Sequence, residues 1–102
     1  MTVAICKLTK TFPPDERLGL TNQPRRAAVS VASNIAEGYG RSTKGEYIQF
    51  LGHARGSNSE VETQLIIAKE LEFGTEASRK RAQTLCADVS RLLGGLMRSL
   101  RG

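Results

Sequence analysis

The sequence predicts an all-α fold, in which a single domain over residues 1–102 forms an antiparallel, up-down-up-down four-helix bundle. Apolar residues recur with the 3.6-residue period of amphipathic helices through most of the chain. Proline, glycine and threonine residues divide the chain into helix-length segments joined by short turns. Only 5% of the residues are aromatic and Trp is absent, so the core must be aliphatic, which suits closely packed helices.

The first helix is expected over residues 2–11. It ends at Phe12-Pro13-Pro14, because consecutive prolines cannot continue the hydrogen-bond ladder of a helix. A short helical turn is expected at residues 15–19, before the second helix begins.

The second helix is expected over residues 22–39, with Thr21 as its N-cap, so that Pro24 lies in the first turn, where no ladder donor is lost. Gly38 and Gly40 are expected to end it in left-handed backbone. At 100° per residue, its apolar residues share one arc of about 160°, which is the expected core side. They are Ala28, Val29, Val31, Ala32, Ile35, Ala36 and Tyr39.

The third helix is expected over residues 44–72, because Thr43 followed by Glu46 is a capping-box pattern. Gly45, Gly52 and Gly56 align on one side of it, outside the predicted core, where a missing side chain lets another backbone approach closely. The predicted core residues are Tyr47, Phe50, Leu51, Ala54, Val61, Leu65 and Ala68.

Ile48 and Ile66 project in one common direction, also away from this core side. Single apolar residues outside a core are common, but a pair beside a line of glycines indicates a second packed surface. We therefore predict a homo-oligomer whose interface includes Ile48, Gly52, Gly56 and Ile66.

The fourth helix is expected over residues 76–99, separated from the third by Phe73-Gly74-Thr75. Gly94-Gly95 should fray or bend it, because each glycine costs up to about 1 kcal/mol relative to Ala in a helix. The predicted buried residues are Ala82, Leu85, Val89, Leu92, Leu93 and Leu96, with Cys86 at the edge of the stripe.

Three passages carry more polar positions than ordinary amphipathic helices: FPPDER at 12–17, QPRRAAVSVASNIAEGYGR at 23–41 and FLGHARGSNSEVETQL at 50–65. They resemble the four-helix-bundle family known from intervening sequences in large-subunit ribosomal RNA genes, to which the accessory variability protein of diversity-generating retroelements is related. The resemblance covers roughly residues 5 to 75 and implies the same bundle.

The resemblance also implies a ring-like homopentamer, with RNA or DNA and a reverse transcriptase as partners. Relatives usually carry a longer first helix than this chain has before Phe12. The first helix is therefore expected to be shortened, which leaves a groove on the bundle open, unless the true start of the chain lies further upstream.

The polar residues of the second helix have two interpretations. They lie together opposite the apolar arc, and the simpler interpretation is an ordinary solvated face. The alternative is a polar network in which Asn34 and Glu37 hydrogen-bond across a helix or subunit boundary, with Arg26 or Arg41 compensating the charge. The full set is Arg26, Ser30, Ser33, Asn34, Glu37 and Arg41.

The net charge of +5 and the sequence pI near 9.7 favour an anionic partner. Positive charge predominates in the second and fourth helices, and negative charge in the third. Repeated around a symmetric ring, this surplus would attract a polyanion weakly, with strong salt dependence and little sequence preference. The alternative is a structural or protein-interaction oligomer whose charge serves only solubility and partner choice. The candidate phosphate-binding residues are Arg25, Arg26, Arg41, Lys44, Lys80, Arg91 and Arg98.

No enzymatic activity, cofactor or metal is expected. His53 is the only histidine, and the residues on its neighbouring turns cannot complete a metal site. Ser57, in the stretch GSNSE, lacks the second glycine and the preceding strand of a nucleophile elbow. Cys6 and Cys86 are expected to be buried, reduced thiols, because they lie in apolar helical patterns without a C-x-x-C spacing. No segment approaches the roughly 20 apolar residues that span a bilayer, so we expect a cytoplasmic protein without membrane association.

Overall fold

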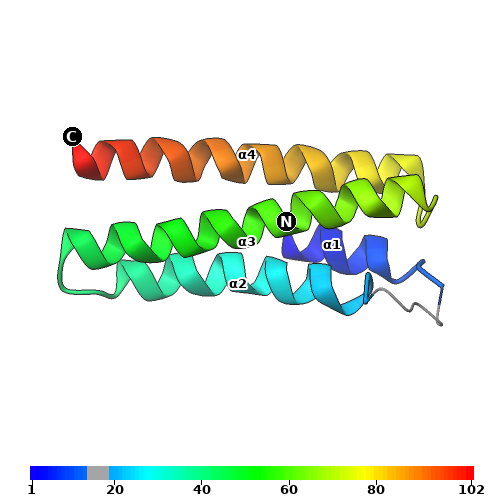
Figure 1. The fold of residues 1–102 in the computed structure, drawn as a ribbon, viewed down its shortest axis with the longest axis horizontal. Helices are drawn as coiled ribbons and strands as arrows, with labels where there is room; N and C mark the ends of the chain where they lie inside the picture. The colour runs from blue at the N-terminus through cyan, green and yellow to red at the C-terminus, as the bar shows by residue number, and fades with distance from the viewer. Residues whose placement is uncertain (14–18) are drawn as a thin grey trace.

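A computed structural model describes residues 1–13 and 19–102. Within these ranges the chain forms four helices and no strand: α1 (Thr2–Thr9), α2 (Asn22–Tyr39), α3 (Lys44–Glu70) and α4 (Glu76–Arg101). Each helix runs opposite to the one before it, so the up-down-up-down arrangement is visible directly (Figure 1). The helical turn predicted at 15–19 lies, apart from Gly19, outside the described residues.

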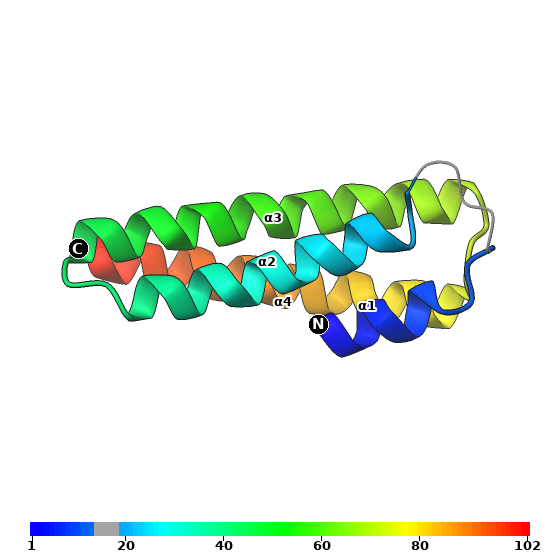
Figure 2. The ribbon, with the colours of Figure 1, turned by 90° about the horizontal axis from the view of Figure 1, so that it is seen from below.

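The first helix ends two residues before the expected bound: α1 has 8 residues, whereas α3 has 27. It lies beside α2 and α4 along one half of the bundle only (Figure 2). In the other half, α3 lies between α2 and α4 with no fourth helix beside them. Among the described residues, the bundle therefore has four helices in one half and three in the other.

The turn between α2 and α3 depends on Gly38. A Cβ atom at this position would lie 2.8 Å from Cβ of Phe50 and 3.0 Å from Cδ1 of Tyr47, so the glycine lets the two helices approach closely. The prediction that α2 ends in left-handed backbone is wrong, because its C-cap residue Gly40 has φ −81°. The predicted capping residue is correct: the Thr43 hydroxyl accepts a hydrogen bond from the Glu46 backbone N–H at 3.1 Å.

The turn between α3 and α4 depends on left-handed backbone. Gly74 has φ +76°, and Glu72 has φ 57°. A Cβ atom at Gly74 would lie 2.5 Å from Cδ1 of Leu8, because α1 packs directly against this turn. The rings of Phe12 and Phe73 meet here with centroids 5.5 Å apart. The C-terminal end of α1 is thus packed against this turn.

The core consists of two clusters of buried apolar side chains, one in each half of the molecule. Met1 packs against both, which places the start of α1 near the middle of the bundle. The cluster around α1 contains Ile5, Leu8, Phe12, Leu20, Ala27, Ala28, Val61, Leu65, Ala68, Ala82 and Cys86. The smaller cluster of the three-helix half contains Val31, Leu51, Ala54, Leu93 and Met97.

The core side of α2 differs from the predicted arc. Its buried residues are Pro24, Ala27, Ala28, Val31 and Gly38, so the helix is rotated toward its polar side. Val29, Ala32, Ala36 and Tyr39, which were expected in the core, are exposed.

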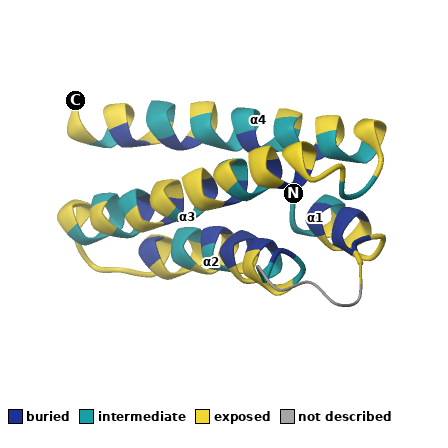
Figure 3. Ribbon diagram, turned by 45° about the vertical axis from the view of Figure 1, so that its right-hand side comes forward, coloured by how far each residue is buried: buried dark blue, intermediate teal, exposed yellow. Residues whose placement is uncertain are grey.

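The core side of α4 differs in the same way. Leu92 and Leu96 were predicted to be buried but are 72% and 36% exposed, whereas Cys86 and Met97 are buried. Figure 3 shows exposed turns along the whole of α4. α1 starts next to Met1, and past this point no described helix covers Leu92 and Leu96. We call the set Ala32, Ala36, Leu92 and Leu96 the open face.

Further predictions on the last helix and the cysteines were wrong in part. α4 continues through Gly94-Gly95 to Arg101, two residues beyond the expected bound, so the helix does not fray at the two glycines. Cys86 is buried as expected, but Cys6 is exposed. Within the described ranges, no helix is long and apolar enough to cross a membrane.

Replacing Gly74 by Ala tests the turn that anchors α1. The new methyl group would overlap Leu8 and occupy left-handed backbone, so we expect a loss of about 2–4 kcal/mol in the free energy of unfolding. Gly40→Ala is the matched control, because its backbone is right-handed and should tolerate the change within about 0.5 kcal/mol. Urea denaturation of both variants measures the difference, and equal stabilities would contradict this account of the turn.

Candidate nucleic-acid interface

The helix order decides which of the candidate basic residues come together. In an up-down-up-down bundle, the end of α2, the start of α3 and the end of α4 lie at one end of the molecule (Figure 1). Arg41 follows α2, Lys44 begins α3, and Arg98 and Arg101 lie in the last turn of α4. We call Arg41, Lys44, Arg98 and Arg101 the basic end.

The remaining candidates do not share this surface. Arg25 and Arg26 lie in the first turns of α2, and Lys80 lies near the start of α4, so these three are near the opposite end. Arg91 lies between the two ends. Arg101 was not among the candidates, although the predicted helix order and its place in the last turn could have identified it.

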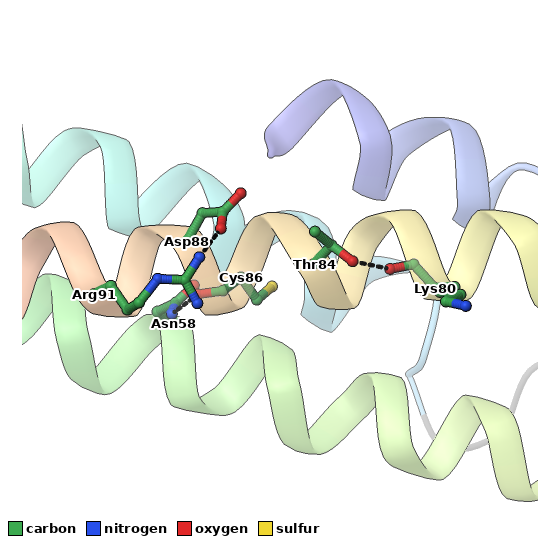
Figure 4. Close-up of polar contacts among 6 residues, drawn as sticks. All are labelled: Asn58, Lys80, Thr84, Cys86, Asp88 and Arg91. Atoms are coloured by element: carbon green, nitrogen blue, oxygen red, sulfur yellow. Dashed lines mark hydrogen bonds and ion pairs between the residues drawn. The ribbon is translucent and has the colours of Figure 1, made fainter.

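Several candidate cations are engaged within the subunit. The Arg25 side chain donates a 2.7 Å hydrogen bond from Nε to the hydroxyl of Thr9, which ties α2 to α1. Arg91 pairs with Asp88 one turn away on α4 (Figure 4). Arg25 thus has a structural role, which reduces its availability for phosphate, whereas the exposed Arg91 pair contributes little to stability.

Arg41 is engaged in two ways. It pairs with Glu37 at 2.7 Å, and its guanidinium carbon lies 4.7 Å from the ring centroid of Phe50. The ion pair is exposed on both sides, so it contributes little to stability and can be exchanged for another anion.

Lys44 has no structural explanation within the subunit. It is exposed in the first turn of α3, where the helix dipole disfavours a positive charge by about 0.3–1 kcal/mol. Arg98 and Arg101, in contrast, lie in the last turn of α4, where the dipole favours them. Among the described residues, Lys44, Arg98 and Arg101 form no ion pair. The basic end therefore presents unneutralised cations to solvent.

The predicted polar network lies within one helix in the isolated subunit. Asn34 donates from Nδ2 to the backbone oxygen and the hydroxyl of Ser30, at 2.8 and 3.0 Å, and Arg41 reaches Glu37 of the same helix. The contact that crosses between helices is instead the 2.9 Å hydrogen bond between the hydroxyls of Ser30 and Ser57. The bonds of Asn34 and Glu37 thus lie within α2 and not across a helix boundary, and the alternative of bonds across a subunit boundary stays a prediction.

The four predicted interface residues have different surroundings. Ile48 is partly buried against the cluster of the three-helix half, whereas Ile66 is 58% exposed. Added Cβ atoms at Gly52 and Gly56 would meet, respectively, only Cε of Met97 at 3.9 Å and nothing within 4 Å. Packing inside the subunit therefore does not require either glycine.

Asn58 is a structural residue that the sequence reasoning missed. It lies in the ARGSNSE motif, is 1% exposed, and donates from Nδ2 to the backbone oxygen of Cys86 at 2.9 Å (Figure 4). Its Oδ1 atom is buried without a hydrogen-bond partner. Its spacing in the sequence could have identified it as buried, because Asn58 falls four residues after Ala54 and three before Val61, both core residues.

The residues considered for catalysis do not form a reactive site. His53 is exposed, with its ring edge toward Phe50 at a centroid distance of 5.9 Å. Burial, and to a smaller extent the charge of Glu62, raise the pKa of the Cys86 thiol from 9.0 to about 11, so it stays protonated at neutral pH. In the described part of the chain, no group of three His, Cys, Asp or Glu residues could hold a metal ion.

The chain was also compared with known proteins. A family model described as 23S rRNA-intervening sequence protein matches residues 1–95. Among solved structures, the chain is similar to a protein of unknown function from the S23 ribosomal protein family of Bacteroides thetaiotaomicron VPI-5482. The two are 21% identical with a TM-score of 0.85, over 94% of this chain and 90% of the other, a likeness that shows the fold alone. The search of curated proteins finds no match.

Asn58→Ala tests the link between α3 and α4. Removing the buried amide deletes its hydrogen bond to Cys86 and leaves a small cavity, so we expect a loss of about 1–3 kcal/mol in unfolding free energy. Ser59→Ala is the control on the neighbouring exposed position, and should change stability by less than about 0.5 kcal/mol. Chemical denaturation compares the two, and an Asn58→Ala protein as stable as the wild type would refute the assignment.

Proposed function

This chain belongs to the 23S rRNA-intervening sequence protein family, as the match over residues 1–95 shows, and on that premise we propose that it is a nucleic-acid-associated scaffold. It acts without catalysis, as a basic homo-oligomer that contacts the phosphates of RNA or DNA. The observation that carries this proposal is the basic end, where cations from three chain segments lie at the same end of the molecule (Figure 1). By analogy with the related retroelement protein, a reverse transcriptase is a proposed partner.

The chemistry of the basic end supports phosphate contact without sequence reading. Arg98 and Lys44 are exposed and free of ion pairs with the described residues, and the exposed pair of Arg41 can be exchanged. Few aromatic residues are available to stack bases, so binding rests on counterion release. We expect weak association that falls steeply as salt rises.

The open face supports self-association. Leu92 and Leu96 of α4 and Ala32 and Ala36 of α2 are exposed in the three-helix half, and covering apolar surface yields about 25 cal/mol per Å². Ile66 adds a separate exposed apolar side chain on α3. A ring-like homopentamer remains the proposed form, and it rests on the family resemblance. Any ring would repeat the basic end around the symmetry axis, so the positive electrostatic potential at the basic ends would be stronger.

A protein-interaction oligomer without nucleic-acid binding is the second candidate. It is favoured by the hydrogen bond of Arg25 to Thr9, which gives this candidate cation a role within the fold. In that case the open face would carry the function, and the charge would serve solubility.

A triple variant of the basic end, K44Q/R98Q/R101Q, tests the first candidate against the second. We expect the wild type to bind generic single-stranded RNA at low salt, with log Kd rising linearly with log salt. The triple variant should lose about two to three units of that slope, because each phosphate contact contributes about 0.7–0.9. Fluorescence anisotropy at several salt concentrations measures both slopes.

The control variant K7Q/K10Q/K69Q removes the same charge from exposed positions away from the basic end. It should keep most of the wild-type slope. An equal loss of slope in both triple variants would refute a localised basic end, and no binding by the wild type at low salt would leave only the second candidate.

A further inference from the structure

A polar groove runs along the seam between α2 and α3. Two hollows of about 350 and 560 Å³ adjoin there, and both are lined by Ser30, Ser57 and Glu60. These volumes fall within the roughly 300–1,000 Å³ typical of ligand sites. Many of the motif residues that the core does not use gather in this groove.

The floor of the groove is a fixed set of hydrogen-bonding groups. The hydroxyls of Ser30 and Ser57 bond to each other at 2.9 Å, and Asn34 donates to the Ser30 hydroxyl at 3.0 Å. This orients the Asn34 amide, whose Oδ1 accepts no hydrogen bond from the described residues. The floor is thus pre-organised before any ligand arrives.

The groove is rich in unused acceptors. Gln64 lines the first hollow, and its Oε1 is buried without a hydrogen-bond partner. Glu60 forms no ion pair with any described residue. Buried acceptors without partners are uncommon in folded proteins and call for a missing donor. Among these acceptors Glu60 lines both hollows, so its carboxylate is the one that an N–H edge of a ligand in either hollow can reach.

Gly56 lines the same groove and has no structural explanation within the subunit. It lies in the middle of α3, where a glycine costs about 1 kcal/mol relative to Ala, and an added Cβ atom would meet nothing within 4 Å. The missing side chain therefore keeps the entrance of the groove open to something from outside the subunit.

The groove also adjoins the basic end. Phe50 and His53 line its second hollow, and Arg41 of the basic end stacks over the Phe50 ring at 4.7 Å. A strand whose phosphates lie on Lys44 and Arg41 would pass beside this hollow, because both residues flank the turn that begins α3. Unpaired bases are commonly held on aromatic or guanidinium planes and read along their hydrogen-bonding edges.

We propose that the α2–α3 groove holds an unpaired base of single-stranded RNA and favours guanine. Guanine offers two adjacent N–H groups, at N1 and at the exocyclic amine, which match the Glu60 carboxylate. The inference deepens the proposed function and rests on it, since the basic end delivers the strand.

Hexauridylates that carry one guanosine, inosine or adenosine test the proposal by fluorescence anisotropy. The wild type should bind the guanosine oligomer about tenfold more tightly than the adenosine oligomer, as one good bidentate base contact provides. Inosine, which lacks the exocyclic amine, should fall between them. The ratio of affinities is the readout, because it cancels the general effect of charge on a polyanion.

Glu60→Gln removes the carboxylate at an exposed position and should bring the guanosine-to-adenosine ratio to about one. Glu70→Gln, an exposed site on α3 outside the groove, makes the same charge change and should keep the ratio. Gly56→Leu should weaken binding of the guanosine oligomer more than binding of the adenosine oligomer, because the new side chain fills the entrance of the groove. Circular dichroism checks that the variant keeps its helix content.

Equal binding of all three oligomers by the wild type would overturn the groove proposal and leave phosphate binding at the basic end standing. A ratio that survives Glu60→Gln would also overturn it. If no oligomer binds at low salt, the groove and the proposed function fail together.

Discussion

The length of α1 is the constraint on which the rest of the structure depends. Its 8 residues extend about 12 Å at 1.5 Å per residue, whereas the molecule is 44 Å long. One half of the bundle is therefore closed around the cluster containing Ile5 and Leu8. The other half leaves Leu92 and its neighbours uncovered, although the same helices continue through both halves.

The packing of α2 against α3 determines where the polar motif residues lie. Gly38 lets these helices approach, and the Ser30–Ser57 hydrogen bond joins their facing polar sides. The polar side of α2 thus belongs to a groove shared with α3, with Arg41 and Phe50 linking it to the basic end. Asn58 of the same motif points the other way and fixes α4 through Cys86.

Sequence reasoning predicted the elements well because their ends carry local signals, such as the Thr43 cap and the turn at Gly74. It failed on which side of α2 and α4 is buried. The apolar arc of each helix is wider than a subunit with a short α1 can cover, so periodicity could not decide between Val29 and Ala27. Asn58 was missed because a buried amide carries no hydrophobic signal. Arg101 lies at the basic end only because the order of the four helices places the end of α4 at the same end of the molecule as the turn between α2 and α3. The sequence of α4 alone does not show this.

The most direct measurement of the central claim, that a second copy covers the half that α1 cannot reach, is hydrogen exchange followed by mass spectrometry. Wild type is compared with a Leu92→Ser variant, which removes little packing inside the subunit because this side chain is 72% exposed. The account requires residues 89–101 to exchange slowly in the wild type and at least about tenfold faster in the variant, with residues 61–68 unchanged. Equally fast exchange of residues 89–101 in both proteins would contradict it.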